Sequence, residues 1–414
     1  MILKEFESLQ YKDEAKPHFI KEETFLAIEK FVLDNEERAQ YLKITTKKGL
    51  GKVLQAQNHV GLIQTKDGTT IEILPKIQEL SEDESKNILI KMLKTLKKSP
   101  FKNVNTAHLQ SSKMPLLEIF ITMFLEELAV LVRKGIKSDY ITKEENLPFL
   151  KGKLKVGEQI KKNSIHKERF YVQYQEFLSD RAENRLIKTT LHYLYKKSHT
   201  TKNQQRIREL LFVFDEISTC KDVKNDFLHV KPNRQMKEYE QILLWCKTFL
   251  LENAFSPYKG SDIAFALLFD MNVLFESYVG AYLKKKGLHV SLQDRGKHLV
   301  EEPRKFALKP DIVVTCKTNH AKIIIADTKW KIIKEEKDIS QSDMYQLFAY
   351  GKKYNNEELY LIYPKDGKTQ PALAYEYEKE KKLNLKVLFF DVTVNERCFV
   401  EHDTPYRLFE LLNR

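Results

Sequence analysis

The sequence predicts a multidomain α+β protein with a β-rich N-terminal part, a helical middle and a C-terminal α/β part built on a mixed sheet. Three observations lead to this fold class. Short apolar runs with turn signals crowd the start of the chain, helical spacing of apolar residues fills the middle, and a Val- and Ile-rich hairpin lies between two helices near the end. The chain of 414 residues is long enough for several domains, which we place at residues 1–165, 166–260 and 261–414.

The N-terminal part is predicted to start with a helix at residues 22–33 and to continue as short strands. Asp67-Gly68 is a strong signal for a tight hairpin turn. Gly49-Leu-Gly-Lys52 lacks the first Gly and the final Ser or Thr of a phosphate-binding P-loop. We interpret it as a turn between strands and expect no nucleotide hydrolysis by this chain. The strands are expected at residues 41–46, 53–57, 60–64 and 70–74.

Helices are expected to dominate the middle of the chain. Ser81 with Glu84 forms a predicted capping box, and Pro115 is expected to open a long amphipathic helix. Residues 149–155 form a short Lys-rich strand that faces either a protein partner or DNA. Ser179 is the predicted N-cap of a further helix. The charged side chains expected to form structural ion pairs in that helix are Arg181, Glu183 and Arg185.

The most informative stretch is a predicted β-hairpin whose apolar strands, residues 311–316 and 322–326, flank a polar turn. Folding the hairpin about the middle of this turn places Asp311 opposite Asp327. Directly opposed residues have Cβ atoms roughly 5 Å apart. Lys329 shares the face of Asp327, because side chains alternate along a strand. The hairpin therefore brings two carboxylates and an ammonium group together.

This constellation predicts metal-assisted phosphodiester hydrolysis. Two close carboxylates repel each other, and a divalent cation removes the conflict. Carboxylate oxygens with water are ligands that Mg²⁺ prefers. Lys329 would position or deprotonate a water molecule, or stabilise charge that develops on a phosphate. The competing interpretation is a surface hairpin with a salt bridge, because Asp-x-Lys is a common pattern.

Two predicted helices flank the hairpin. The first, at residues 269–286, carries Glu276 near its apolar face, and the second, at residues 340–350, carries Gln346 and Tyr350 on one face. Helix, hairpin and helix with Glu, Asp, Asp-x-Lys and Gln in this order resemble the core of PD-(D/E)xK nucleases. The stretch Met271-Asn-Val-Leu-Phe-Glu276, the hairpin and Tyr345-Gln346 are similar to the McrC family, the nuclease subunits of 5-methylcytosine restriction systems.

The resemblance implies a Mg²⁺-dependent endodeoxyribonuclease and assigns a role to each matching residue. Lys329 would act on the attacking water or the phosphate, Gln346 would orient Lys329 or touch DNA, and Tyr350 is expected in the core. The metal ligands that the resemblance implies are Asp311, Asp327, Glu276 and the carbonyl group of Thr328.

The resemblance also implies a partner, a McrB-like AAA+ ring that binds and hydrolyses GTP. The N-terminal part, including residues 61–76, would dock on this ring and stimulate it, while the C-terminal part cuts double-stranded DNA in a modification-dependent restriction system. Two alternatives remain. One is a non-catalytic activator of the motor, and the other is a stand-alone PD-(D/E)xK repair nuclease.

Composition agrees with a polyanionic partner. Lys and Arg number 70 against 58 Asp and Glu, a net charge of +12, although a solubilising lysine surface gives the same balance. No signal peptide or run of ~20 apolar residues is present, so we expect a cytoplasmic protein. The four cysteines form no C-x-x-C pair, which argues against a zinc or iron–sulfur site. They are Cys220, Cys246, Cys316 and Cys398.

Overall fold

Apolar residues in alternation and at helical spacing give the chain a mixed α/β, multidomain architecture, as predicted. The chain divides into two units, one made of Met1–Leu116 with Tyr258–Arg414 and the other of Leu117–Pro257. The division into three domains stays a prediction. The computed structural model describes residues 1–33, 40–77, 80–97, 99–102, 114–230, 238–251, 263–315, 323–366, 373–378, 383–395 and 398–399.

The first unit opens with a four-stranded sheet in the order β1-β6-β5-β10 and a three-stranded sheet in the order β2-β4-β3. Phe25 and Ile28 of helix α1 pack with Ile63 and Ile73 of the larger sheet. The bounds are β1 Ile2–Lys4, β2 Ser8–Leu9, α1 Glu22–Leu33, β3 Leu42–Lys47, β4 Gly51–Ala56, β5 His59–Thr65, β6 Thr70–Leu74, α2 Glu82–Leu93 and β10 Ile263–Asp270.

Several local predictions for this region are confirmed. Ser81 and Glu84 form the capping box of α2. The Gly49-Leu-Gly-Lys52 stretch joins β3 to β4, and Gly49 and Gly51 both adopt positive φ. Strand β10 corrects another prediction, because it extends to Asp270, where a helix starting at residue 269 was expected. β10 instead pairs antiparallel with β5 along its length.

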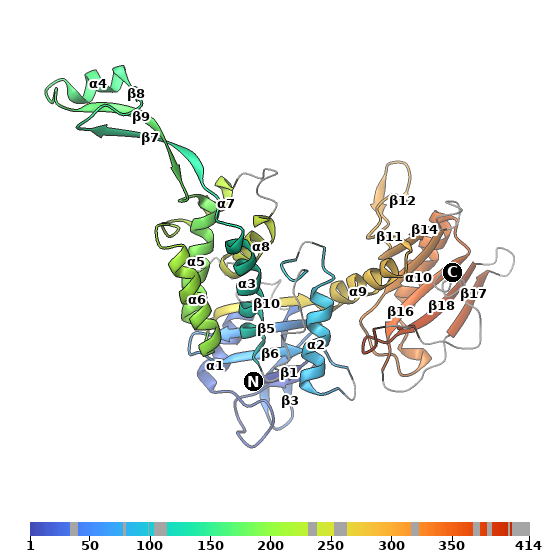
Figure 1. Cartoon of the computed structure of the whole chain (residues 1–414). Coiled ribbons are helices and arrows are strands. Elements are labelled where there is room, and N and C mark those ends of the chain that lie inside the picture. The colour runs from blue at the N-terminus through green and yellow to red at the C-terminus, as the bar shows by residue number, and fades with distance from the viewer. Residues whose placement is uncertain are drawn as a thin grey trace. The chain divides into compact units, whose positions relative to one another are not determined.

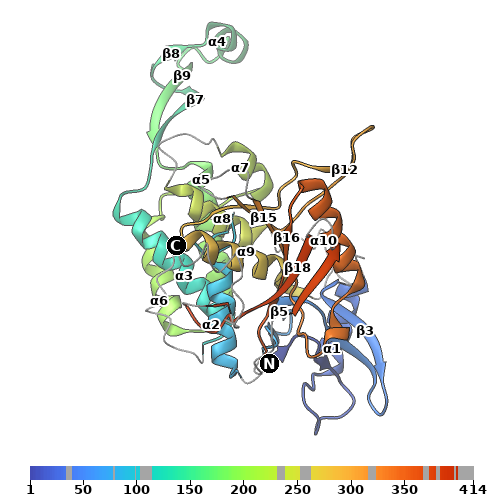
Figure 2. The ribbon, with the colours of Figure 1, turned by 90° about the vertical axis from the view of Figure 1, so that its right-hand side faces the viewer.

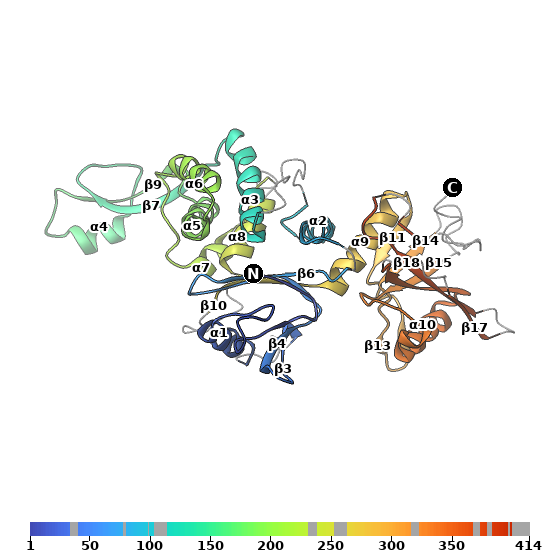
Figure 3. The same cartoon turned by 90° about the horizontal axis from the view of Figure 1, so that it is seen from below.

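The C-terminal part of the same unit holds a six-stranded mixed sheet in the order β11-β14-β15-β16-β18-β17. Helices α9 and α10 cover its opposite faces (Figure 3). Successive residues of β18 show this, because Phe389 joins the cluster around Leu347 of α10 while Phe390 packs against Phe275 and Tyr282 of α9. The mixed sheet with helices on its faces is therefore as predicted.

The elements of this part follow the predicted order with some changes. The tract 376–382 was expected to be a charged loop, but β17 extends to Glu378, and residues 379–382 lie outside the described residues. The bounds are α9 Met271–Lys285, β11 His289–Leu292, β12 His298–Val300, β13 Lys305–Ala307, β14 Ile312–Thr315, β15 Ile323–Thr328, η5 Glu336–Asp338, α10 Gln341–Tyr354, β16 Glu358–Pro364, β17 Leu373–Glu378 and β18 Leu383–Phe390.

The second unit combines helices with a long β-arm, residues 139–178, which holds β7, β8, α4 and β9 and projects away from α5–α8 (Figures 1 and 2). The predicted strand at residues 149–155 is reduced to the two residues of β8. No helix in the described part of the chain is long and apolar enough to cross a membrane. The bounds are α3 Leu116–Arg133, β7 Asp139–Leu147, β8 Lys153–Leu154, α4 Val156–Asn163, β9 Phe170–Leu178, α5 Ala182–Lys197, α6 Thr201–Val213, α7 Val223–His229 and α8 Tyr239–Leu250.

Candidate active site

The predicted hairpin forms in the predicted register. Ile312 pairs with Ala326, and Thr315 pairs with Ile323, in an antiparallel ladder between β14 and β15. Continuing this register by one step sets Asp311 opposite Asp327, and the charge of Asp311 acts on the pKa of Asp327. The turn that joins the strands, residues 316–322, lies outside the described residues. Residues at equal distances along the chain from the middle of the polar turn pair with each other, as folding the hairpin about that turn predicts.

Asp327 and Lys329 form an ion pair at the end of β15. Asp327 is only 1% exposed. Within the described part of the chain, its Oδ1 atom is buried without a hydrogen-bond partner. The main chain of Lys329 is fixed by a hydrogen bond from its N–H to the carbonyl of Ile362 in β16 (3.0 Å). A buried carboxylate oxygen with no donor is costly unless a ligand satisfies it.

Asp311 is held in place by Thr328. The N–H of Thr328 donates to Oδ2 of Asp311 at 2.8 Å, and its hydroxyl donates to the same atom at 2.9 Å. These two bonds aim the carboxylate of Asp311 back toward β15. The predicted metal ligation by the Thr328 carbonyl stays a prediction, because the observed contacts use the other polar atoms of this residue.

Glu276 reaches the same region from helix α9. The helix starts at Met271, with the side chain of Asp270 as N-cap. Glu276 is 6% exposed and accepts a hydrogen bond from the side-chain amide of Gln293. Gln293 has a φ of 55°, and its N–H donates to the carbonyl of Asp311 (2.9 Å). Sequence reasoning missed Gln293, which connects two of the predicted acids.

Burial and mutual repulsion hold the acids in an unusual protonation state. Burial, with the charge of Asp311, raises the pKa of Glu276 to about 7, and the same two causes raise the pKa of Asp327 to about 7. Burial also raises the pKa of Asp311. For Lys329, burial acts to lower the pKa, but the charges of Asp327 and Asp311 outweigh it and the pKa is raised. The three carboxyl groups therefore attract positive charge.

The residues present fit a Mg²⁺ ion held by a small number of protein ligands. The described residues contain no group of three or more His, Cys, Asp or Glu arranged to hold a metal. Asp311 and Asp327 nevertheless provide two adjacent carboxylates, one with an unpartnered buried oxygen. Mg²⁺ usually keeps several waters and binds through one or two carboxylates and substrate phosphates. Ligation by Glu276 stays a prediction.

Helix α10 places two further predicted residues beside the hairpin. The side-chain amide of Gln346, which is exposed, donates to the hydroxyl of Tyr350 at 2.6 Å. Tyr350 is buried in the core cluster, as predicted. Burial and the charges of Asp327 and Asp311 raise the pKa of Tyr350. The predicted contacts of Gln346 with Lys329 or DNA stay predictions.

The end of the motif strand is also tied to the N-terminal sheet. The N–H of Trp330 donates to Oδ1 of Asn272 (3.1 Å), and its indole N–H donates to Oε2 of Glu5 (2.9 Å). Glu5 is fully buried and also accepts from the N–H of Lys76 (2.9 Å). The residue that follows Lys329 is thus fixed from β10–α9 and from the start of the chain.

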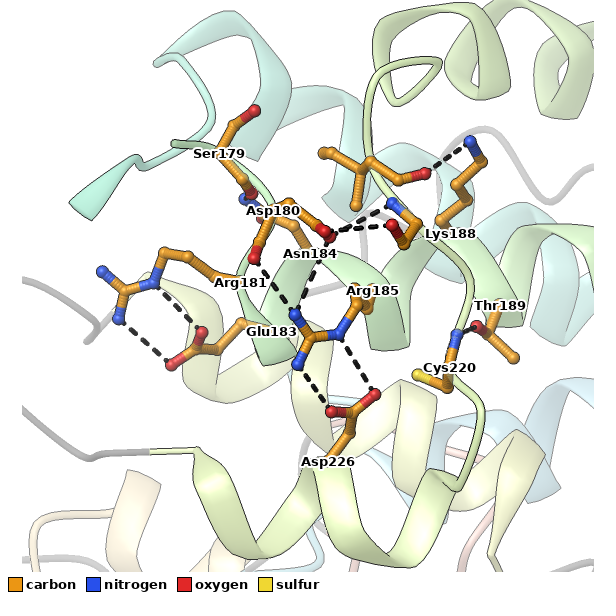
Figure 4. Close-up of polar contacts among 12 residues, drawn as sticks. Ser179, Asp180, Arg181, Glu183, Asn184, Arg185, Lys188, Thr189, Cys220 and Asp226 are labelled. Carbon is orange, nitrogen blue, oxygen red and sulfur yellow. Dashed lines mark hydrogen bonds and ion pairs between the residues drawn. The ribbon is translucent and has the colours of Figure 1, made fainter. Parts of the chain in front are cut away.

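In the second unit, the predicted ion pairs lie at the start of α5, next to the segment that joins this helix to the arm (Figure 4). Arg181 pairs with Glu183, and Arg185 pairs with Asp226 at 2.7 Å, so these pairs are confirmed. Ser179 is not the N-cap, because α5 begins at Ala182 with Arg181 in the cap position. The pairs lie in a cluster of polar contacts at the root of the arm.

Asn184 forms hydrogen bonds with the main chain at both ends of the arm, where it joins the helices. Its side-chain amide donates to the carbonyls of Lys137, which precedes β7, and of Ser179, which follows β9, at 3.0 and 2.8 Å. Its carbonyl oxygen accepts from the hydroxyl of Tyr239 (3.0 Å), which in turn accepts from the N–H of Lys137 (3.0 Å). This network fixes the two strands of the arm on α5 and α8.

The arm exposes large apolar side chains. Five of them lie in the outer part of the arm and have exposed fractions of 55% to 86%. Exposed apolar groups that gather in one place mark interaction sites more often than isolated ones do. The five are Phe149, Leu150, Val156, Ile160 and Ile165.

Comparisons with known proteins agree with this architecture. One similar chain is found in a refined half-complex from a tetradecameric assembly of Thermococcus gammatolerans McrB AAA+ hexamers with bound McrC, with 20% identity, a TM-score of 0.70, and coverage of 100% of this chain and 98% of that chain. Another is found in a structure of the Thermococcus gammatolerans McrBC complex, with 21% identity, a TM-score of 0.52, and coverage of 70% and 89%. At these identities the likeness shows the fold.

No curated protein sequence matches the chain. The model of one protein family, described as McrBC 5-methylcytosine restriction system component, matches residues 54–364. This range covers most of the chain and includes the arm, Glu276 and the whole of the hairpin. The chain therefore belongs to the family of McrBC 5-methylcytosine restriction system components.

Proposed function

We propose that the chain is the Mg²⁺-dependent DNA endonuclease subunit of a McrBC-type, modification-dependent restriction system. The observation that carries the proposal is the placement of Asp311, Asp327 and Lys329 at one end of a hairpin inside a mixed sheet. Helices α9 and α10 bring Glu276 and Gln346 to the two faces of this sheet. The arrangement supports a PD-(D/E)xK nuclease core, the fold that the motif pattern resembles.

The chemistry follows from the charges of these groups. Asp311 and Asp327 would hold Mg²⁺, which polarises a phosphate oxygen and acidifies a water molecule when it is bound. Lys329 has a raised pKa and remains a cation at neutral pH, so it is suited to stabilise the negative charge that develops on the phosphate. Glu276, with a pKa of about 7, is suited to exchange a proton with water near neutral pH.

We further propose that the chain cuts DNA when it is assembled on a GTP-hydrolysing McrB-like AAA+ ring and that it stimulates this ring. A solved relative is bound to McrB AAA+ hexamers, and the fold of this chain is similar over its whole length. The exposed apolar residues of the arm support a docking role, because a free β-arm gains little by keeping such groups in water. The hydrogen bonds of Asn184 to both ends of the arm also support a docking role, since they fix the direction of the arm.

Two other functions remain alternatives. A non-catalytic activator of the motor would need the arm but not the acids. The buried, unpartnered Oδ1 of Asp327 speaks against it, because such an atom costs stability and has no purpose in a purely structural hairpin. A stand-alone repair nuclease would need the acids but not the arm, whose exposed apolar groups would then be a liability.

One experiment separates the three functions. The purified chain is mixed with modified plasmid DNA, Mg²⁺ and GTP, with and without the purified AAA+ partner, and both DNA cleavage and GTP hydrolysis are measured. The proposed function predicts cleavage only with the partner and faster GTP hydrolysis in the presence of the chain. Faster hydrolysis without cleavage would identify an activator, and cleavage without the partner would identify a stand-alone nuclease.

A further inference from the structure

A small β-hairpin lies in the chain between Gln293 and Asp311, two residues of the candidate active site. The N–H of Gln293 donates to the carbonyl of Asp311 (2.9 Å). The residues between these two, 294–309, lie outside the six-stranded sheet. Strands β12 and β13 pair within this segment, which we call the site hairpin. Figures 1 and 2 show it standing out from the six-stranded sheet.

Two acidic side chains of the site hairpin contact helix α10. The carboxylate of Asp294 accepts from the hydroxyl of Tyr354 (2.6 Å), and Glu301 pairs with Lys353 at 3.2 Å. Both partners lie in the last turn of α10. These contacts fix the direction of the hairpin and also occupy two of its three acidic side chains.

The remaining charge of the site hairpin is strongly positive. Its five lysines and arginines are all exposed, and no ion pair is found for them among the described residues. The charge of Lys309 acts on the pKa of both Glu276 and Asp311, so the base of the hairpin lies within electrostatic range of the acids. Unpaired cations along one edge of a site match a line of phosphates. The five are Arg295, Lys297, Arg304, Lys305 and Lys309.

An exposed aromatic side chain interrupts this positive charge. Phe306 is 71% exposed and has a φ of 55°, a conformation that an L-residue rarely adopts. Leu299 on the opposite strand is 46% exposed. Proteins that bind the minor groove of DNA frequently insert apolar side chains such as Phe and Leu between base steps.

We propose that the site hairpin binds the DNA duplex beside the scissile phosphate, with its lysines and arginines on the phosphates and Phe306 against the bases of the minor groove. The inference rests on the proposed nuclease function and adds the element that positions the substrate. The charge of the hairpin and its continuity with Gln293 and Asp311 favour DNA over a protein partner.

Two variants of the full chain test the two kinds of contact. Binding of a fluorescent duplex of 30 base pairs is followed by anisotropy in EDTA between 50 and 200 mM KCl. Arg304→Ala with Lys305→Ala should weaken binding at least about tenfold and make the slope of log K against log salt less negative by about 2. Phe306→Ala should weaken binding about threefold to tenfold with an unchanged slope, because the contact it removes carries no charge.

The matched control is Lys47→Ala with Lys48→Ala, which removes the same charge from the exposed end of β3 and should bind DNA as the wild type does. DNA cleavage and partner binding are measured on the same proteins. If both hairpin variants bind and cut DNA as well as the wild type does, the inference is overturned and the nuclease function is unaffected. Loss of partner binding with unchanged DNA binding would also overturn it and would make the hairpin a protein-docking element. A wild-type chain that does not cut DNA with its partner would instead remove the proposed function.

Discussion

The ammonium group of Lys329 is paired with the carboxylate of Asp327, a side chain that is 1% exposed and whose second oxygen has no donor within the described residues. One carboxylate oxygen of Asp327 therefore has Lys329 as its partner, while the other has no partner among the described residues. Removing charged groups from water is costly, and a single ion pair seldom repays that cost. A cation at this position would supply the missing partner of Asp327.

Glu276 is expected to make stability depend on pH. Burial raises its pKa from 4.5 to about 7, so the folded state binds more protons than the unfolded state between these values, and stability falls as the pH rises through this window. Glu276→Gln removes the titration but keeps an acceptor for Gln293. In EDTA, the variant should be more stable than the wild type at pH 8 by up to about 3 kcal/mol, with the difference shrinking toward pH 5. The account would be contradicted if denaturant unfolding gave the same difference in stability between Glu276→Gln and the wild type at pH 5 and at pH 8.

Mg²⁺ should stabilise the chain in the absence of DNA. A ligand that binds only the folded state at ten times its dissociation constant adds about 1.4 kcal/mol. We expect millimolar Mg²⁺ to raise the Tm of the wild type at pH 7.5 and to have little effect on Asp311→Asn. The control Asp215→Asn, which alters an exposed acid of the second unit, should respond as the wild type does. An equal shift for all three proteins would show that Mg²⁺ acts elsewhere.

Trp330→Phe tests the link between the motif strand and the N-terminal sheet. The variant keeps an aromatic ring against Phe275 but removes the donor to Glu5. We expect a loss of about 1–2 kcal/mol in the free energy of unfolding, because a buried carboxylate loses one of its two donors. Denaturant unfolding measures it, and a variant as stable as the wild type would show that this hydrogen bond contributes nothing.

The outer part of the arm should carry part of the affinity for the AAA+ partner. Val156 and Ile160 lie four residues apart on α4 and are both exposed. Changing both to Ser should weaken partner binding at least about tenfold, equivalent to about 1.4 kcal/mol, and should lower GTPase stimulation with no change in Tm. Phe212→Ser with Leu228→Ser removes two apolar groups of even higher exposure from α6 and α7 and serves as control. Equal effects of both pairs would contradict a specific role of the arm.

Local pattern was enough to predict much of the candidate site. The polar turn between two apolar runs was enough to predict the register of β14 and β15, and helical spacing placed Glu276 and Tyr350 on buried faces. Contacts between distant residues leave no such pattern. Glu5 and Trp330 are 325 positions apart, and nothing near either residue indicates the hydrogen bond that joins them.

Other features were missed for equally physical reasons. The role of Gln293 depends on a positive φ in a loop, which the sequence does not signal at a non-glycine residue. The end of β10 was assigned to a helix because its apolar residues continue directly into those of α9, and the pairing with β5 that makes it a strand is far away in the chain. Ser179 was predicted as the N-cap because serine favours that position, but the helix starts three residues later, at Ala182.

DNA cleavage by variants of the Asp327–Lys329 pair tests the central claim most directly. Cleavage of modified plasmid is measured with the AAA+ partner, GTP and Mg²⁺ for the wild type, Asp327→Asn, Lys329→Met and the neighbouring control Lys331→Met. The account predicts a fall of at least about 100-fold for the first two variants, with partner binding and GTPase stimulation intact, and wild-type cleavage for Lys331→Met. Undiminished cleavage by either Asp327→Asn or Lys329→Met would contradict it.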